Sequence, residues 1–357
     1  MHNHKILYLV LVGIALITGF GAMTYPFTGS KTDLAPDENT PIGDVLKKLG
    51  KSNASELKTI EGASVEKGRD LVHKGYAIGP DGKRTKQQSK FYVCTTCHNV
   101  VKEFEDPSLI SAEMRLDYAM KNKVPFLQAS GFYGIVNRTS FYNDDYQVKY
   151  EGIDGIEAAN KDLRAAIQFC SKTCSQGREL ADWEIESILA YFWTLQFKMG
   201  DLKLNEAQKK QIDLAFSDGK DKESAAKILE TKYAAAMPAH ILKIPKFVAP
   251  DESEYKNTQK LKEGKAIYDQ GCLHCHLNKK YSFFGLDNEY LTFKAMEKAT
   301  RKENYILSMN FLVREGLPPR MGNHSYMPEF TAEKMSPEQL KNLYLYVSAQ
   351  AKGKYKE

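Results

Sequence analysis

The chain has almost no excess of charge of either sign. Its 357 residues contain 50 lysines and arginines against 45 aspartates and glutamates, which leaves a net charge of +5. So dispersed an excess gives no reason to expect nucleic acid as a partner, and it fits an anionic small substrate or an acidic redox partner equally well. With 42% hydrophobic and 27% charged residues, the composition is that of a globular protein with room for two medium domains.

Cysteine is scarce as well, and its placement excludes a disulfide framework. Four of the six cysteines fall in two CxxCH motifs. Two thiols at this spacing reach the two vinyl groups of one porphyrin, and the imidazole that follows can swing beneath the iron. A zinc or redox pair would need a second CxxC or a thioredoxin context, and both are missing. We therefore predict two covalently bound haem c groups, with attachment residues Cys94, Cys97 and His98 in the first motif and Cys272, Cys275 and His276 in the second, each histidine being a proximal iron ligand.

The N-terminus lacks charge from Ile6 to Met23. This run is either a signal-peptide core or a membrane anchor of about 20 residues. Because Phe20 occupies a position where a cleavage site needs a small residue, we favour an uncleaved anchor helix. Lys5 before the run and Asp33 after it favour an orientation that places the rest of the chain in the periplasm, anchored to the inner membrane.

The rest of the chain contains two copies of one unit. Residues 68–75 match residues 264–271 in spacing, and each stretch leads to a CxxCH motif. Downstream of each motif, apolar residues recur at i, i+3, i+4 and i+7 after a cap-like Asp182 or Ser336, which predicts two amphipathic closing helices.

Such a unit is typical of the class I cytochrome c fold. In that fold Gly68 or Gly264 would let the first and last helices cross closely, with Tyr191 or Tyr346 at the crossing. We therefore predict an all-α protein with two class I cytochrome c-like haem domains. The expected order is an anchor or signal segment at 1–23, a tether at 24–55, a first cytochrome c domain at 56–200, a helical linker at 201–250 and a second cytochrome c domain at 251–357.

The second unit carries a methionine between its CxxCH motif and its closing helix. Met327-Pro328 occupies the place of the axial methionine loop of class I cytochromes, and a soft thioether favours ferrous iron. We predict Met327 as the sixth ligand of the second haem. Met321 and His324 are the alternatives, since a different course of the loop would bring either of them near the iron.

The first unit lacks such a methionine. When the closing helices are aligned, Met327 falls opposite Lys172, so that Cys170 and Cys174 straddle the ligand position. A thiolate from Cys170 would donate charge to ferric iron and lower its potential. A disulfide between Cys170 and Cys174, or two inert thiols, are the alternatives. In a helix, Cβ atoms four residues apart lie about 6 Å from each other, against about 3.8 Å in a disulfide, which favours the ligand.

The segment that begins at Cys170 resembles the haem-ligating cysteine segment of dihaem thiosulfate dehydrogenases and related sulfur-oxidising cytochromes. The likeness is carried by Cys170, the Gly177-Arg178 step and the acidic amphipathic helix that follows. In that family, as here, a His/Cys haem precedes a His/Met haem. The resemblance implies an active site at the first haem for a small sulfur oxyanion, with catalytic residues Cys170, Arg138, Arg164 and Arg178.

Two functions are compatible with this pattern. The first is oxidation of thiosulfate to tetrathionate, with electrons passing to a partner cytochrome or respiratory complex. The second is a membrane-tethered electron carrier between a quinol-oxidising complex and a terminal oxidase, with no substrate of its own. Thr173 and Cys174 stand where the family has Arg-Ser, which favours the carrier. A dihaem peroxidase would need a vacant haem and a distal acid or base that the sequence does not place.

Overall fold

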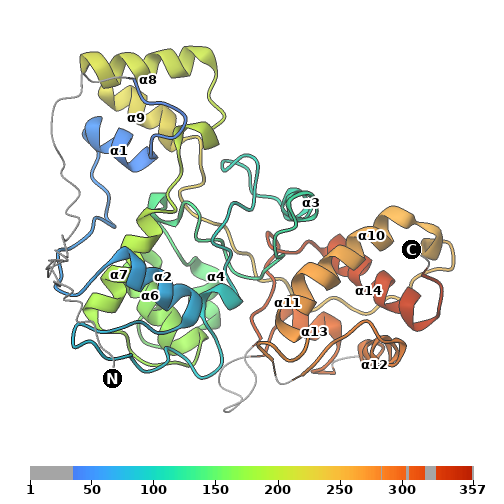
Figure 1. The fold of residues 1–357 in the computed structure, drawn as a ribbon. Coiled ribbons are helices and arrows are strands. Elements are labelled where there is room, and N and C mark those ends of the chain that lie inside the picture. Colours follow the sequence, from blue (N-terminus) through green and yellow to red (C-terminus); the bar gives the residue numbers. More distant parts are fainter. Residues whose placement is uncertain (1–34, 283, 303–304, 318–326, 356–357) are drawn as a thin grey trace, which may run out of the picture. The chain divides into compact units, whose positions relative to one another are not determined.

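The computed structural model describes residues 35–282, 284–302, 305–317 and 327–355 (Figure 1). These residues form helices and no strands, apart from isolated bridges such as the one between Leu317 and Met327. The all-α prediction is therefore confirmed. The predicted anchor and the alternative ligands Met321 and His324 lie outside the described residues. Within the described ranges, no helix is long and apolar enough to cross a membrane.

In the first domain, α2 (Val65–Lys74) crosses α7 (Asp182–Trp193). A Cβ atom on Gly68 would lie only 1.8 Å from the Ser187 carbonyl oxygen, so no other residue fits at this contact. Tyr191 packs at the same crossing, where its hydroxyl lies 3.0 Å from His73 Nε2. The contact predicted for Gly68 is present.

The second domain repeats this crossing between α10 (Thr258–Ile267) and α14 (Pro337–Ala351). A Cβ atom on Gly264 would lie 2.0 Å from the Asn342 carbonyl oxygen and 2.8 Å from Tyr346 Cβ. Figure 1 shows α10 and α14 side by side, as it shows α2 and α7. The two units of the sequence therefore share one helix crossing, which is the central feature of the predicted fold.

The closing helices begin in different ways. Ser336 caps α14 by accepting from the Gln339 backbone N–H, while the Gln339 side chain accepts from the Ser336 N–H. At α7 the expected cap is wrong, because Asp182 is already the first helical residue and Ala181 takes the cap position. There the Glu184 carboxylate accepts from the Ala181 N–H and supplies the missing bond.

The remaining helices connect and cover these two crossings. They are α1 (Ile42–Lys48), α3 (Ala112–Asn122), α4 (Asp144–Lys149), α5 (Ile156–Lys161), α6 (Leu163–Phe169), α8 (Glu206–Asp218), α9 (Lys222–Glu230), α11 (Leu273–His276), α12 (Tyr290–Thr300) and α13 (Met309–Arg314).

The parts predicted as tether and linker form a core of their own. Ile42 and Val45 of α1 are fully buried against Ile212 of α8 and Leu229 of α9. The backbone N–H of Ile42 also donates to the Phe197 carbonyl. From α1 onward the predicted tether is therefore packed structure, and the predicted linker helices pack against it.

The core of the second domain extends beyond its predicted boundary. Leu116 and Ala119 of α3, together with Phe126, pack with Leu340 and Val347 of α14. Sequence position had assigned α3 to the first domain. A stretch of chain that follows the first CxxCH motif is thus buried in the domain that carries the second.

Candidate haem-binding sites

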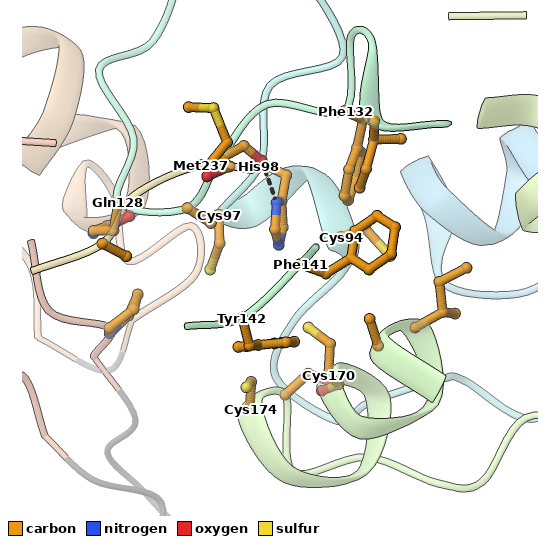
Figure 2. A pocket seen from close by; sticks show the side chains of 18 of the residues that line it. Cys94, Cys97, His98, Gln128, Phe132, Phe141, Tyr142, Cys170, Cys174 and Met237 are labelled. Atoms are coloured by element: carbon orange, nitrogen blue, oxygen red, sulfur yellow. Dashed lines mark hydrogen bonds between the residues drawn. The ribbon is translucent and has the colours of Figure 1, made fainter. Parts of the chain in front are cut away.

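The first CxxCH motif opens onto a cavity (Figure 2). Cys94, Cys97 and His98 line one side, and Cys170 and Cys174 line the other. The space within the lining, including its mouth, is about 1440 Å³. The apolar lining includes Phe132, Ile135, Phe141, Leu163, Ala166, Ile188 and Phe192.

His98 is held as a metal ligand would be. Its Nδ1–H donates to the Ser130 carbonyl oxygen at 2.7 Å, which leaves the lone pair on Nε2. The Phe132 ring stacks on the imidazole with centroids 4.3 Å apart. Burial lowers the pKa of His98 to about 4, so the ring is neutral at physiological pH. Tautomer, orientation and charge state all suit a proximal iron ligand.

Cys170 approaches from the opposite side on an unusual turn. Helix α6 runs directly into a π-helical turn, Cys170–Cys174, closed by the Ser175 N–H donating to the Cys170 carbonyl at 2.9 Å. Such turns hold more residues than an α-helical turn and recur at functional sites. Figure 2 shows the Cys170 side chain pointing into the cavity toward His98, with Cys174 beside Tyr142. The two cysteines are free thiols, not a disulfide.

The two thiols have different surroundings. The Cys170 thiol donates to the Cys174 sulfur, which raises the pKa of Cys170 and lowers that of Cys174. The hydroxyls of Tyr150 and Tyr142 lower the pKa of Cys174 further, and the Tyr150 oxygen lies 3.9 Å from its sulfur. The surroundings therefore favour the protonated form of Cys170 and the thiolate form of Cys174.

The donors around this cavity fit a haem c. Cys94 and Cys97 would form the thioether bonds, His98 would be the proximal ligand, and Cys170 is the sulfur opposite it. A haem iron held this way supplies one-electron redox chemistry. The apolar lining would keep water from the metal.

Only one of the three predicted arginines reaches the cavity. Arg138 lines it, with Nη2 donating to the Gly131 carbonyl at 3.0 Å. Arg164 forms a buried ion pair with Glu186 instead. Arg178 pairs with Glu184 at 2.5 Å, and its guanidinium also donates to the Lys86 carbonyl, which ties the segment between α2 and the first CxxCH motif to α7. The structure does not bring Arg164 or Arg178 to the cavity, because carboxylates of α7 hold both.

Sequence reasoning missed the residues that reach this cavity from a distance. Tyr142 and Tyr146 line it from the irregular middle of the first domain, and Glu329, Thr331 and Lys334 line it from the second domain. The tyrosines stand in the aromatic-rich stretch 141–150, and this richness is the signal that could have found them. Nothing in the local sequence marks the others, since their placement depends on the contact between the domains.

The second CxxCH motif orients its histidine as the first does, although its backbone is different. Cys272 ends a π-helical turn, Tyr268–Cys272, and α11 carries the rest of the motif. His276 Nδ1 donates to the Phe284 carbonyl at 2.8 Å, which again leaves Nε2 for a metal. Met327, the predicted sixth ligand, exchanges backbone hydrogen bonds with Leu317.

The two attachment motifs touch each other. Cys275 Sγ lies 3.7 Å from the Thr96 carbonyl oxygen, which belongs to the first motif. The Phe126 N–H also donates to the Gln270 carbonyl at 3.1 Å, just before the second motif.

Comparison with known families identifies the second unit. Residues 259–347 match the family of cytochrome c oxidase, cbb3-type, subunit III. This stretch contains the second CxxCH motif, Met327 and most of α10 and α14. The second domain is a c-type cytochrome domain. Such a domain implies covalently bound haem c and electron transfer. No curated protein and no solved structure matches the chain.

Proposed function

We propose that this protein is a dihaem cytochrome c that oxidises a small sulfur oxyanion at the first haem and passes the electrons to the second. The observation that carries the proposal is the placement of Cys170 on the far side of the cavity from His98. A thiolate ligand lowers the potential of a haem and leaves a polarised sulfur beside the metal. A plain electron carrier has no need of such a sulfur.

Thiosulfate oxidation suits the number of attachment motifs. Two thiosulfate ions join through a new sulfur–sulfur bond to give one tetrathionate and two electrons, and no proton is taken up or released. Two one-electron groups would hold both electrons until a partner collects them. Within the cavity, Arg138 is the predicted cation that can meet the oxyanion, while the aromatic wall excludes water.

Electrons would leave through the second domain. The contact between Cys275 and the carbonyl of Thr96 provides a short path between the two motifs. Met327 as sixth ligand would give the second haem the higher potential, because a thioether favours the ferrous state. We place the protein in the periplasm, held to the inner membrane by residues 1–23, with a redox partner cytochrome or respiratory complex as acceptor.

Mixing the oxidised holoprotein with sodium thiosulfate tests the enzyme directly. We expect thiosulfate to reduce the haems and tetrathionate to appear at one per two electrons. Cys170→Ala should abolish this reduction while both haems remain attached. Arg164→Gln is the matched control, because Arg164 is held by Glu186 outside the cavity. Haems that stay oxidised with thiosulfate, and stay reduced with tetrathionate, would exclude this chemistry.

An electron carrier is the second candidate, and one observation favours it. The family that matches residues 259–347 is a subunit of a terminal oxidase, so the second domain suits electron delivery between respiratory complexes. This candidate predicts reduction of the haems by a quinol-oxidising complex and no reaction with thiosulfate.

A further inference from the structure

One wall of the first haem cavity comes from the second domain. Thr331 and Lys334 line the cavity although they follow Met327 in sequence. Both are buried, with 1% and 3% of their surface exposed. Among the described residues, the Thr331 hydroxyl oxygen and the Lys334 ammonium nitrogen have no hydrogen-bond partner. Two polar atoms are thus buried at the cavity wall without a hydrogen bond, and the Lys334 nitrogen has only an ion pair with Glu103 at 3.6 Å.

The charges around Lys334 do not balance. The groups that act on it most strongly are Glu103, Arg115 and Arg138. Glu103 lies 2.8 Å from Arg115 Nη2 and 3.6 Å from Lys334 Nζ. One carboxylate therefore faces three cations, and buried charges are stable when they are paired.

The acidic residue nearest in sequence does not supply the missing charge. Glu329 also lines the cavity, but its carboxylate is paired with Lys149 at 2.6 Å. It is not among the groups that act most strongly on Lys334.

The two Nη atoms of Arg115 are paired where they lie, although its Nε has no hydrogen-bond partner among the described residues. Its guanidinium donates to the carbonyls of Leu127 and Lys334 and covers the Phe126 ring. The two cations that remain, Lys334 and Arg138, both line the cavity.

Burial weakens both of these cations. Desolvation lowers the pKa of Lys334 to about 7 and that of Arg138 to about 10, against the opposing attraction of Glu103. The proximity of Arg138 lowers the pKa of Lys334 further. An anion placed beside them would favour their charged forms and raise both pKa values.

We propose that Lys334 and Arg138 form an oxyanion subsite in the first haem cavity, so that the second domain supplies part of the first domain's ligand site. The ligand is a carboxylate or a sulfur oxyanion. Its two sources are a propionate of the haem held at Cys94 and Cys97, or a soluble ion. The proposal rests on the proposed function only in requiring a haem in the first domain.

Variants of the two cations test the subsite at pH 6, where Lys334 is charged. Lys334→Met and Arg138→Met remove one cation each, and Lys334→Arg keeps the charge. Lys341→Met is the matched control, because Lys341 lies in the same domain with 73% of its side chain exposed. Two quantities are measured on each holoprotein: the midpoint potential of the first haem, and the dissociation constant of sodium sulfate from haem difference spectra. Sulfate serves as probe because it does not reduce the haems.

The two sources give different results. If the ligand is a soluble oxyanion, wild-type protein binds sulfate, and each Met variant weakens binding by roughly tenfold or more. If the ligand is a propionate, sulfate has no effect, and each Met variant shifts the first haem to lower potential, because a nearby cation favours the ferrous form. Lys334→Arg and Lys341→Met should behave as wild type in either case.

The proposal is overturned if both Met variants match wild type in potential and in sulfate binding. Arg138→Met keeps the test decisive should Lys334→Met fail to fold. A pyridine haemochrome assay on the same samples gives the number of haems per chain. One haem per chain would instead refute the dihaem function. Failure of the subsite proposal and failure of the proposed function therefore give different results.

Discussion

Glu103 is the residue whose removal should damage the protein most without touching a haem ligand. Its carboxylate accepts from Arg115 Nη2 at 2.8 Å, from Asn99 Nδ2 at 2.9 Å and from the Gly131 N–H at 3.0 Å. The side chains of Glu103 and Arg115 are only 4% and 2% exposed. This pair joins α3, which packs with the second domain, to the stretch that follows the first CxxCH motif.

Glu103→Gln keeps the shape of the side chain and removes its charge. Removing one partner of a buried pair costs about 3–5 kcal/mol, since the other charge stays buried and uncompensated. The cost should lie toward the upper end if Lys334 also stays charged. At neutral pH Lys334 can instead lose its proton, because its pKa is about 7, so the Arg115 pair dominates the cost.

The sign of the pH dependence follows from the Glu103 pKa. Burial alone would raise this pKa, but attraction from Arg115 and Lys334 outweighs burial and holds it well below its ordinary value. In the unfolded chain the pKa of a glutamate carboxyl is about 4.3. Glu103 therefore stabilises the folded protein fully above that pH. This stabilisation is lost as the pH falls through the lower pKa that Glu103 has in the folded protein. The gap between wild type and Glu103→Gln should shrink in acid.

Urea unfolding of the holoprotein, followed by far-UV circular dichroism, measures this effect. Glu105→Gln is the matched control, because Glu105 pairs with Lys121 at the exposed surface. We expect a large drop in the urea midpoint for Glu103→Gln and none for Glu105→Gln. The same midpoint in both variants at pH 7 would refute the assignment of a structural ion pair at the domain contact.

Three further predictions concern the fold and the haems. Gly264→Ala should destabilise the second domain by roughly 1–3 kcal/mol, because its Cβ would lie 2.0 Å from the Asn342 carbonyl; an unchanged thermal midpoint would contradict the helix crossing. Arg164→Gln should lower the thermal midpoint but leave the haem absorption spectrum unchanged, since the ion pair of Arg164 with Glu186 lies outside the cavity. An altered spectrum would show that Arg164 does act on the haem. Cys272→Ala combined with Cys275→Ala should halve the pyridine haemochrome absorbance per chain, and an undiminished value would show that the second motif holds no haem.

The fold was predictable from short patterns that recur. Gly68 and Gly264 stand at the same place in the matching stretches 68–75 and 264–271, and each occupies a crossing where a Cβ atom cannot fit. The two haem attachment sites were equally predictable from the CxxCH motifs, because the two thiols and the histidine that a haem c needs lie within one turn of the chain. The two closing helices followed from apolar periodicity, which depends only on neighbours along the chain.

Contacts between distant segments could not be predicted in this way. Lys334 reaches the first haem cavity only because α3 and the segment after Met327 bring the domains together. Arg164 and Arg178 lie near Cys170 in sequence and carry the right charge for an oxyanion. The carboxylates that pair with them lie on α7. Packing decides which neighbour an arginine pairs with, and the sequence does not show this packing.

Low-temperature EPR of the oxidised holoprotein tests the central claim most directly, namely that Cys170 faces His98 as the sixth ligand of the first haem. The comparison is between wild type, Cys170→Ala and Cys174→Ala. We predict a low-spin signal of a thiolate-ligated haem in wild type and in Cys174→Ala, and its loss in Cys170→Ala with both haems still attached. A Cys170→Ala spectrum identical to that of wild type would contradict the account.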